Sequence, residues 1–201
     1  MEYENFDIKN FVQNKLLQNS NIILIASRPG VGKTTFAIHI IKEILDKNKN
    51  IMFFSLENNV IDLSHRIYNI FKNQTIFEKI TTKDIYNEID NMTFHYYDYE
   101  IHLSNEQKQE KILEKIETNS NTSLIVFDYL QLYKFDEKFL EKLKSINIPI
   151  LILSQLDRKS KYKNIEIVDK KTIREIRLLD KYVDIFLFLD KKNNKIKVRI
   201  N

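Results

Sequence analysis

Short apolar runs separated by amphipathic stretches occur along most of the chain. The clearest apolar runs are Ile22–Ala26, Ile51–Leu56, Ser123–Phe127, Ile150–Leu153 and Ile185–Leu189. Runs of this length, bounded by polar turns, are typical of buried β-strands. Alternation of such strands with helical segments is typical of βαβ units, whose strands pair in parallel. The pattern therefore predicts an α/β domain with a mostly parallel twisted sheet flanked by helices.

The intervening segments show helical spacing and capping signals. Apolar residues repeat at helical intervals in 37–45, in 60–71 and around 139–143, and residues 172–179 also favour a helix. Thr81-x-x-Asp84 and Ser104-x-x-Gln107 have the spacing of capping boxes. Met92–Tyr97 predicts a further strand. Ile196–Ile200 follows the last apolar run across the polar segment Asp190–Lys195, which predicts a C-terminal β-hairpin.

The chain has 201 residues, a length that suits one domain with a single core. It contains no Pro/Gly/Ser-rich linker, so we expect one domain over 1–201, with an N-terminal helical arm at 1–20 and a core at 22–201. The arm has an amphipathic pattern. It either packs on its own sheet or docks on a neighbouring subunit.

The composition indicates the cellular compartment of the protein and the kind of partner it binds. The chain has no cysteine and no apolar run near the roughly 18 residues of a membrane-spanning helix, and it starts on an acidic, polar segment. These features predict a cytoplasmic protein without a membrane partner. From Gln155 to Asn201 there are 14 Lys/Arg against 7 Asp/Glu, which leaves 18 against 21 in the rest of the chain. This basic quarter indicates either an anionic partner or a solvated lysine-rich surface.

Glycine is scarce, and its position is informative. Both glycines and one of the two prolines fall within 29–32. Ser27–Thr34 matches the phosphate-loop pattern G-x-x-x-x-G-K-[ST], except that Ser27 replaces the first glycine. Between a strand and a helix, such a loop directs backbone N–H groups at an anion, while Lys33 contacts phosphate and Thr34 offers a hydroxyl to Mg²⁺. We expect nucleotide binding by Arg28, Pro29, Gly30, Val31, Gly32, Lys33, Thr34 and Thr35.

Three polar residues follow predicted strands and would complete a hydrolytic site. Asp128 ends the strand 123–127, beside the loop, where a carboxylate can orient the shell of Mg²⁺. Glu57 ends the strand 51–56, where it can orient or deprotonate an attacking water. Gln155 follows the strand 150–153 and can sense the γ-phosphate.

Several motifs in register resemble one family. Ile23–Thr35, Phe53–Glu57, Asp128–Leu132, Ile148–Leu156 and Arg158 resemble the C-terminal motor domain of DnaB-type replicative helicases, a RecA-like ATPase. The stretch from Ile173 to Asp184 is similar to the family's L-R-E…I…A-D segment, and Lys197–Asn201 is similar to its K-x-R-x-G ending. The resemblance covers residues 22–201.

The resemblance implies a fold and an activity. The fold would be that of a RecA-like P-loop NTPase, and the chain would be an Mg²⁺-dependent ATPase that binds single-stranded DNA and moves along it. It would act as a homo-oligomeric ring, such as a hexamer, with a primase or a helicase loader as further partners.

The resemblance also implies residue roles. Lys33 and Glu57 would be catalytic, and Thr34 and Asp128 would hold the metal. Gln155 would link the nucleotide state to the DNA-facing loop. Arg199, with Lys197, would reach across a subunit boundary as an arginine finger.

Some features depart from the family pattern. We expect the motor to lack the N-terminal domain of the family. The connection Tyr133–Glu137 is short, and Asn201 replaces the family's last glycine. The basic stretch after Gln155 predicts DNA contacts through Arg158, Lys159, Lys161 and Lys163, unless it is a solvated lysine run.

Two alternatives to a complete helicase motor therefore stay open. One is a minimal DNA-dependent ATPase or helicase accessory that does not unwind DNA alone. The other is a nucleotide-gated assembly module without a DNA role.

Overall fold

The computed structural model describes residues 3–4, 6–18, 21–45, 49–55, 60–71, 94–98, 103–128, 135–156, 179–192 and 195–200. The strands are β1 (Tyr3–Glu4), β2 (Ile22–Ser27), β3 (Asn50–Ser55), β4 (Phe94–Asp98), β5 (Thr122–Asp128), β6 (Ile150–Gln155), β7 (Ile185–Lys192) and β8 (Lys195–Ile200). The helices are α1 (Ile8–Phe11), the π-helical turn η1 (Val12–Leu16), α2 (Lys33–Leu45), α3 (Val60–Phe71), α5 (Asn105–Thr118) and α7 (Glu137–Ser145).

The described strands form one sheet in the order β1-β8-β7-β2-β6-β5-β3-β4. Neighbouring strands pair in parallel throughout, apart from the antiparallel pair of β7 and β8. The predicted mostly parallel sheet with a C-terminal hairpin is therefore confirmed. Because parallel strands run in one direction, the carboxyl ends of β2, β5 and β6 meet at the same edge of the sheet.

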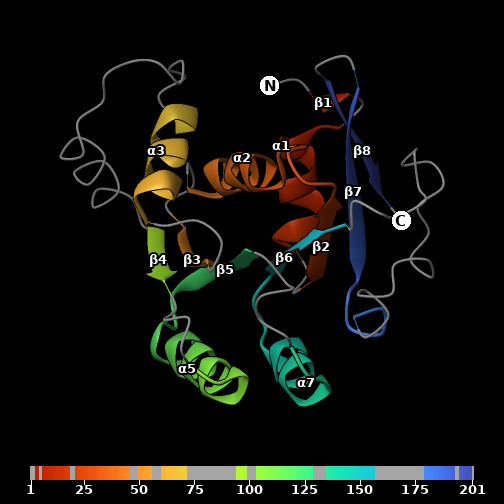
Figure 1. The fold of residues 1–201 in the computed structure, drawn as a ribbon. Helices are drawn as coiled ribbons and strands as arrows, with labels where there is room; N and C mark the ends of the chain where they lie inside the picture. Colours follow the sequence, from red (N-terminus) through yellow and green to blue (C-terminus); the bar gives the residue numbers. More distant parts are fainter. Residues whose placement is uncertain are drawn as a thin grey trace.

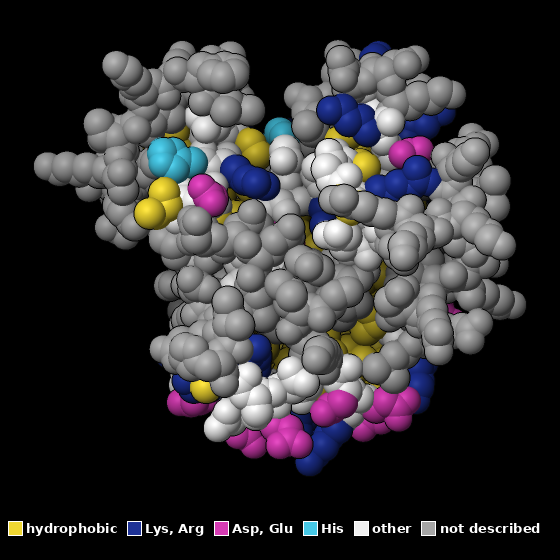
Figure 2. All heavy atoms as spheres, in the orientation of Figure 1, with side chains coloured by type: hydrophobic (Ala, Val, Ile, Leu, Met, Phe, Trp, Pro, Cys, Tyr) yellow, Lys and Arg dark blue, Asp and Glu magenta, His cyan; other side chains and the backbone are white. Residues whose placement is uncertain are grey.

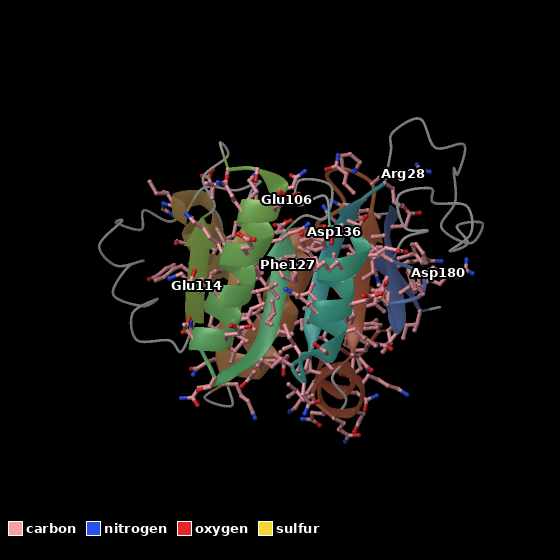
Figure 3. All side chains as sticks on the ribbon, turned by 90° about the horizontal axis from the view of Figure 1, so that it is seen from below. Arg28, Glu106, Glu114, Phe127, Asp136 and Asp180 are labelled. Carbon is pink, nitrogen blue, oxygen red and sulfur yellow. The ribbon has the colours of Figure 1, made fainter. Side chains whose placement is uncertain are left out.

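Helices cover both faces of the sheet (Figure 1). On one face α1, η1, α2 and α3 pack over the odd-numbered positions of β2, including Ile23 and Ile25. On the other face α5 and α7 pack over the even-numbered positions, including Leu24, and over Phe127 of β5, which Figure 3 shows beneath these two helices. Burial on both faces explains why the central strands are continuous apolar runs in the sequence.

The N-terminal arm packs on its own sheet. Phe11, Val12 and Leu16 are buried in the same cluster as α2, and the Phe6 ring lies 5.2 Å from that of Phe11 and 5.5 Å from that of Phe36. The two-residue strand β1 pairs with β8 at the sheet edge. Of the two placements expected for the arm, the structure shows the one within the same chain.

Local signals in the sequence match the helix starts that the structure describes. Ser104 Oγ accepts from the Gln107 amide at 3.2 Å, and the Gln107 side chain accepts from the Ser104 amide at 3.0 Å, so the predicted capping box is confirmed. The second predicted box, at 81–84, lies outside the described residues, as do residues 172–178 of the helix predicted over 172–179. Leu179, the last residue of that predicted helix, lies in a turn.

The hairpin is tighter than the sequence suggests. The polar segment 190–195 predicts a connection between the two strands, but Asp190, Lys191 and Lys192 belong to β7 and Lys195 begins β8. Their register partners run to Lys192 opposite Lys195. Asp190, Lys191 and Lys195 are strand residues, but they lie at strand ends that extend past the buried core, so their side chains are half-buried or exposed. This explains why the segment is polar although it is part of the hairpin strands. None of the described helices has the length and apolar character needed to cross a bilayer.

Candidate nucleotide-binding site

A cavity of about 350 Å³ lies at the carboxyl ends of the central strands. The loop between β2 and α2 forms most of it, together with residues from α3, β6 and β7. Its lining residues are Ser27, Arg28, Pro29, Gly30, Val31, Gly32, Lys33, Thr34, Thr35, Arg66, Gln155 and Lys191. The structure thus brings the whole predicted phosphate loop into one cavity.

The loop needs its two glycines. Gly30 has φ +78° and Gly32 has φ +109°, a region that residues with a Cβ atom rarely adopt. At Gly30 a Cβ atom would meet no neighbour within 4 Å, so the backbone angle rather than crowding explains glycine there. The Phe36 amide donates to Gly32 O at 2.8 Å, and α2 begins at Lys33. The N-terminus of α2 therefore faces the cavity, as an anion-binding helix requires.

Ser27 occupies the position where the phosphate-loop pattern has a glycine. Its side chain is buried and its Oγ donates to Arg28 O at 3.0 Å. Ser27 O also accepts from the Leu156 amide at 2.8 Å, which ties the end of β2 to the end of β6. The substitution is accommodated because the hydroxyl finds a partner inside the loop.

A buried hydrogen bond joins the helix start to the end of β5. Thr34 Oγ1 donates to Asp128 Oδ2 at 3.0 Å, and Asp128 is fully buried. A hydroxyl and a carboxylate are oxygen donors of the type that Mg²⁺ prefers, and Mg²⁺ usually takes only one or two protein ligands beside substrate phosphates and water. Within the described ranges no group of three or more His, Cys, Asp or Glu residues gathers as a denser metal site. This donor pair therefore fits the predicted Mg²⁺ site.

Gln155 lies beside the loop. It is the last residue of β6 and the register partner of Ser27 on β2, and its half-buried side chain lines the cavity. An uncharged amide at this point can hydrogen-bond to a phosphate oxygen without adding charge. This position fits the prediction that the Gln155 side chain contacts the terminal phosphate of a bound nucleotide.

Two further basic residues line the cavity, and sequence reasoning does not identify them. Arg66 comes from the exposed face of α3, opposite the apolar stripe that identifies that helix. Lys191 comes from β7, within the segment that the sequence assigns to the hairpin loop. No signal in the sequence singles out either residue, because their place depends on how α3 and β7 pack around the loop.

Other predicted site residues lie elsewhere. Lys197 and Arg199 are on β8 and do not line the cavity of their own chain, which is compatible with the predicted action across a subunit boundary. Glu57 and the predicted DNA-contacting residues lie outside the described residues. The latter are Arg158, Lys159, Lys161 and Lys163.

The fold and the cavity define a class of protein. It is an α/β domain in which a glycine-containing loop between a buried strand and a helix forms a binding site for phosphate groups. Residues 12–199 match the family model of the DnaB-like helicase C-terminal domain. The chain belongs to this family.

Curated relatives agree. A probable replicative DNA helicase of Guillardia theta is 29% identical over 175 residues, which cover 73% of this chain and 28% of the relative. The replicative DNA helicase DnaB of Geobacillus stearothermophilus is 27% identical over 207 residues, covering 89% of this chain and 45% of the relative. The chain thus spans less than half of the length of these relatives.

Solved structures match the fold. One solved ATPase domain has a TM-score of 0.63 at 23% identity, covering 86% of this chain and 70% of that one. A DnaB-like replicative helicase, solved in a study of its interactions with primase, has a TM-score of 0.64 at 22% identity, covering 87% of this chain and 48% of that one. The predicted RecA-like fold is confirmed.

Proposed function

We propose that this chain is the ATP-hydrolysing motor domain of a replicative helicase, which couples hydrolysis to binding and movement along single-stranded DNA. The observation that carries the proposal is the buried contact of Thr34 with Asp128 at the start of α2, directly beneath a loop that bends on Gly30 and Gly32. This arrangement places a hydroxyl and a helix N-terminus at the cavity, with the Asp128 carboxylate buried behind the hydroxyl of Thr34.

The cavity has the charge that a nucleoside triphosphate needs. Arg28, Lys33, Arg66 and Lys191 line it, and none of the described residues that line it is Asp or Glu. The backbone N–H groups of the loop and the ammonium of Lys33 would bind the phosphates, while Gln155 would contact the terminal one. Bound Mg²⁺, held through Thr34 and near Asp128, would supply charge neutralisation on the phosphate oxygens.

Hydrolysis needs a water held in line with the terminal phosphorus. Glu57 is our candidate for orienting that water and accepting its proton, from its place directly after β3 in the sequence and from the family resemblance. Lys197 and Arg199 would reach the cavity from a neighbouring copy and stabilise the charge on the leaving phosphates. The working form would then be an oligomer, with a ring as the arrangement in which every cavity receives a neighbour's cations.

The DNA part of the proposal rests on the relatives, which are named replicative DNA helicases, and on the basic stretch that holds Arg158, Lys159, Lys161 and Lys163. Cations along a single strand release counterions, so binding should weaken with salt at a log–log slope of about −0.7 per phosphate contact. A helicase loader or a primase is the further partner that we propose, the latter because one structural neighbour was solved in a study of its interactions with primase.

The decisive experiment is steady-state ATPase activity across a range of protein concentrations, with and without single-stranded DNA. We expect DNA to stimulate turnover and specific activity to rise with concentration, because each site is completed by a neighbour. ATPase activity without strand separation would indicate a helicase accessory instead. Activity that responds to neither DNA nor salt would leave a nucleotide-gated assembly module.

The substitution Glu57→Gln tests the hydrolytic assignment. It should abolish turnover and leave binding of a fluorescent ATP analogue unchanged, because the amide cannot accept the proton. Glu114→Gln on the exposed face of α5 makes the same change away from the cavity and serves as the control. Turnover that survives in Glu57→Gln would show that another group orients the water.

A further inference from the structure

Ser27 lies where the sheet ends and the phosphate loop begins. It is the last residue of β2, with Gln155 of β6 and Leu189 of β7 as its register partners on either side. Ser27 O also accepts from the Leu156 amide at 2.8 Å, and the side chain of Ser27 is fully buried. The sheet therefore fixes the place of Ser27, and its hydroxyl can hold the residues that follow.

The first half of the loop is a turn over Arg28–Val31. The Val31 amide donates to Arg28 O at 3.4 Å, and Pro29 and Gly30 occupy the two central positions. A proline followed by a glycine with positive φ, here +78°, is typical of a type II turn. The usual donor–acceptor distance of an N–H···O bond is about 2.7–3.2 Å, so the bond that closes this turn is a long and weak one.

The hydroxyl of Ser27 supplies a second hydrogen bond to the same carbonyl. Ser27 Oγ donates to Arg28 O at 3.0 Å, and a carbonyl oxygen has two lone pairs, so it can accept from both donors. The phosphate-loop pattern has a glycine at this position, which has no side chain to make such a bond. Because Gly30 and Gly32 give the loop many other backbone conformations, a bond that favours one of them has an effect on binding.

We propose that Ser27 is a positioning residue for the nucleotide: its hydroxyl holds the turn Arg28–Val31 in the conformation that binds phosphates. The proposal rests on the nucleotide binding proposed above. A phosphate loop is held only by contacts within the chain until the phosphates arrive. The apparent affinity falls with the fraction of molecules whose loop has the binding conformation. Ser27 thus acts on nucleotide association through the turn, and not by a contact of its own with the phosphates.

Stopped-flow binding of a fluorescent ADP analogue tests the proposal. Ser27→Ala should lower the association rate about fivefold, as expected when one hydrogen bond that selects the binding conformation is lost. The dissociation rate should stay the same, because bound phosphates hold the loop in both proteins. Ser27→Gly restores the residue of the pattern and should slow association at least as much, since it also frees the backbone.

Two results would overturn the proposal. One is an association rate in Ser27→Ala equal to that of wild type. The other is a faster dissociation in Ser27→Ala with unchanged association, because the hydroxyl would then contact the bound nucleotide instead of the loop.

Ser145→Ala is the matched control. Ser145 Oγ donates to Lys142 O at 2.7 Å at the exposed end of α7, so this variant loses the same kind of bond away from the cavity. Figure 2 shows acidic and basic side chains gathered over α5 and α7, at the bottom of the view. The binding kinetics of Ser145→Ala should equal those of wild type. Slower association in this variant as well would contradict a specific role for Ser27.

Two further readouts separate this proposal from the proposed function. In the steady-state assay, Ser27→Ala should raise the KM for ATP about fivefold and leave kcat unchanged, because saturating ATP fills every site. Without nucleotide, the Val31 amide should exchange its hydrogen faster in Ser27→Ala and at the wild-type rate in Ser145→Ala. If wild type hydrolysed no ATP, the proposed function would fail, while the association rates and the Val31 exchange would still decide on Ser27. Unchanged Val31 exchange in Ser27→Ala would show that the hydroxyl does not hold the turn.

Discussion

Thr34 combines a structural role with its proposed role at the metal. Its hydroxyl donates to the buried Asp128 carboxylate, and Thr34→Val removes that donor while keeping the shape of the side chain. We expect a loss of about 1.5–3 kcal/mol in the free energy of unfolding, as for hydrogen bonds to charged groups, and a loss of ATPase activity. Thr34→Ser keeps the hydroxyl and is the control. Urea unfolding measures the stability. Equal urea midpoints for wild type and Thr34→Val would contradict the proposal that the Thr34–Asp128 hydrogen bond stabilises the fold.

His39 gives the fold a dependence on pH. Burial in α2, with help from the charge of Lys42, holds the pKa of His39 below its ordinary value of 6.5. The unfolded chain therefore takes up the proton more readily, so the contribution of His39 to stability is complete above about pH 6.5 and declines as the pH falls from there toward the folded-state pKa. The variant His39→Gln should lose less stability than wild type between pH 7 and pH 5. Thermal or urea unfolding at several pH values checks this, and parallel pH profiles of the two proteins would contradict it.

Residue patterns predict the loop but not its surroundings. Gly30, Gly32, Lys33 and Thr34 can be assigned from spacing alone, because a phosphate loop is a local structure whose chemistry lies in consecutive residues. Arg66 cannot, because a charged residue on the polar face of a helix is indistinguishable from a solvated one until the packing of that helix is known.

At the scale of elements, the carboxylate of Asp184 joins two strands and a helix at the amino ends of the strands, away from the nucleotide cavity. Asp184 Oδ2 accepts from the Ile22 amide at 2.8 Å, where β2 begins, and its carboxylate lies 2.6 Å from Lys144 Nζ on α7. The Asp184 amide donates to Ile22 O at 2.8 Å. Asp184 thus aligns the starts of β2 and β7, and its place in the family-like stretch Ile173–Asp184 has a structural explanation.

This alignment predicts unequal effects for the two partners. Asp184→Ala should cost about 1.5–3 kcal/mol, since it leaves the amide at the start of a buried strand without its charged acceptor. Lys144→Met should cost less than about 1 kcal/mol, because the ion pair is partly exposed. Urea unfolding gives both values, and hydrogen exchange at Ile22 should quicken only in Asp184→Ala. A larger loss in Lys144→Met would show that the ion pair dominates.

The elements with strong periodicity or caps are predictable from the sequence. The central strands are buried on both faces, and α5 begins on a complete capping box, so local sequence and tertiary packing agree there. The two-residue strand β1 is not predictable, because two residues have no period and the pairing partner is far along the chain. Nor is the π-helical turn at Val12–Leu16, whose apolar spacing is that of an ordinary helix.

In the whole molecule, the nucleotide cavity and the contacts that stabilise the fold at Asp184 lie at opposite ends of the sheet strands. The nucleotide cavity lies at the carboxyl ends of the strands, while the contacts of Asp184 lie at their amino ends. The arm, α2 and α3 occupy the face that bears the loop, and α5 and α7 occupy the other (Figure 1). Substitutions at Asp184 or Ser104 should therefore alter stability without altering the KM for ATP.

The place of Arg199 on β8, away from the cavity of its own chain, has a genetic consequence if it acts on a neighbouring copy as proposed. A chain with Lys33→Ala has a defective cavity and an intact Arg199, whereas a chain with Arg199→Ala has an intact cavity and lacks the proposed finger cation. Each alone should be inactive, yet a mixture of equal parts should regain activity at those junctions where an intact cavity meets an intact hairpin, about a quarter of them in a head-to-tail ring. Two inactive variants would then complement each other within one assembly. The ATPase rate of the mixture, relative to wild type, would give the fraction of junctions that are active.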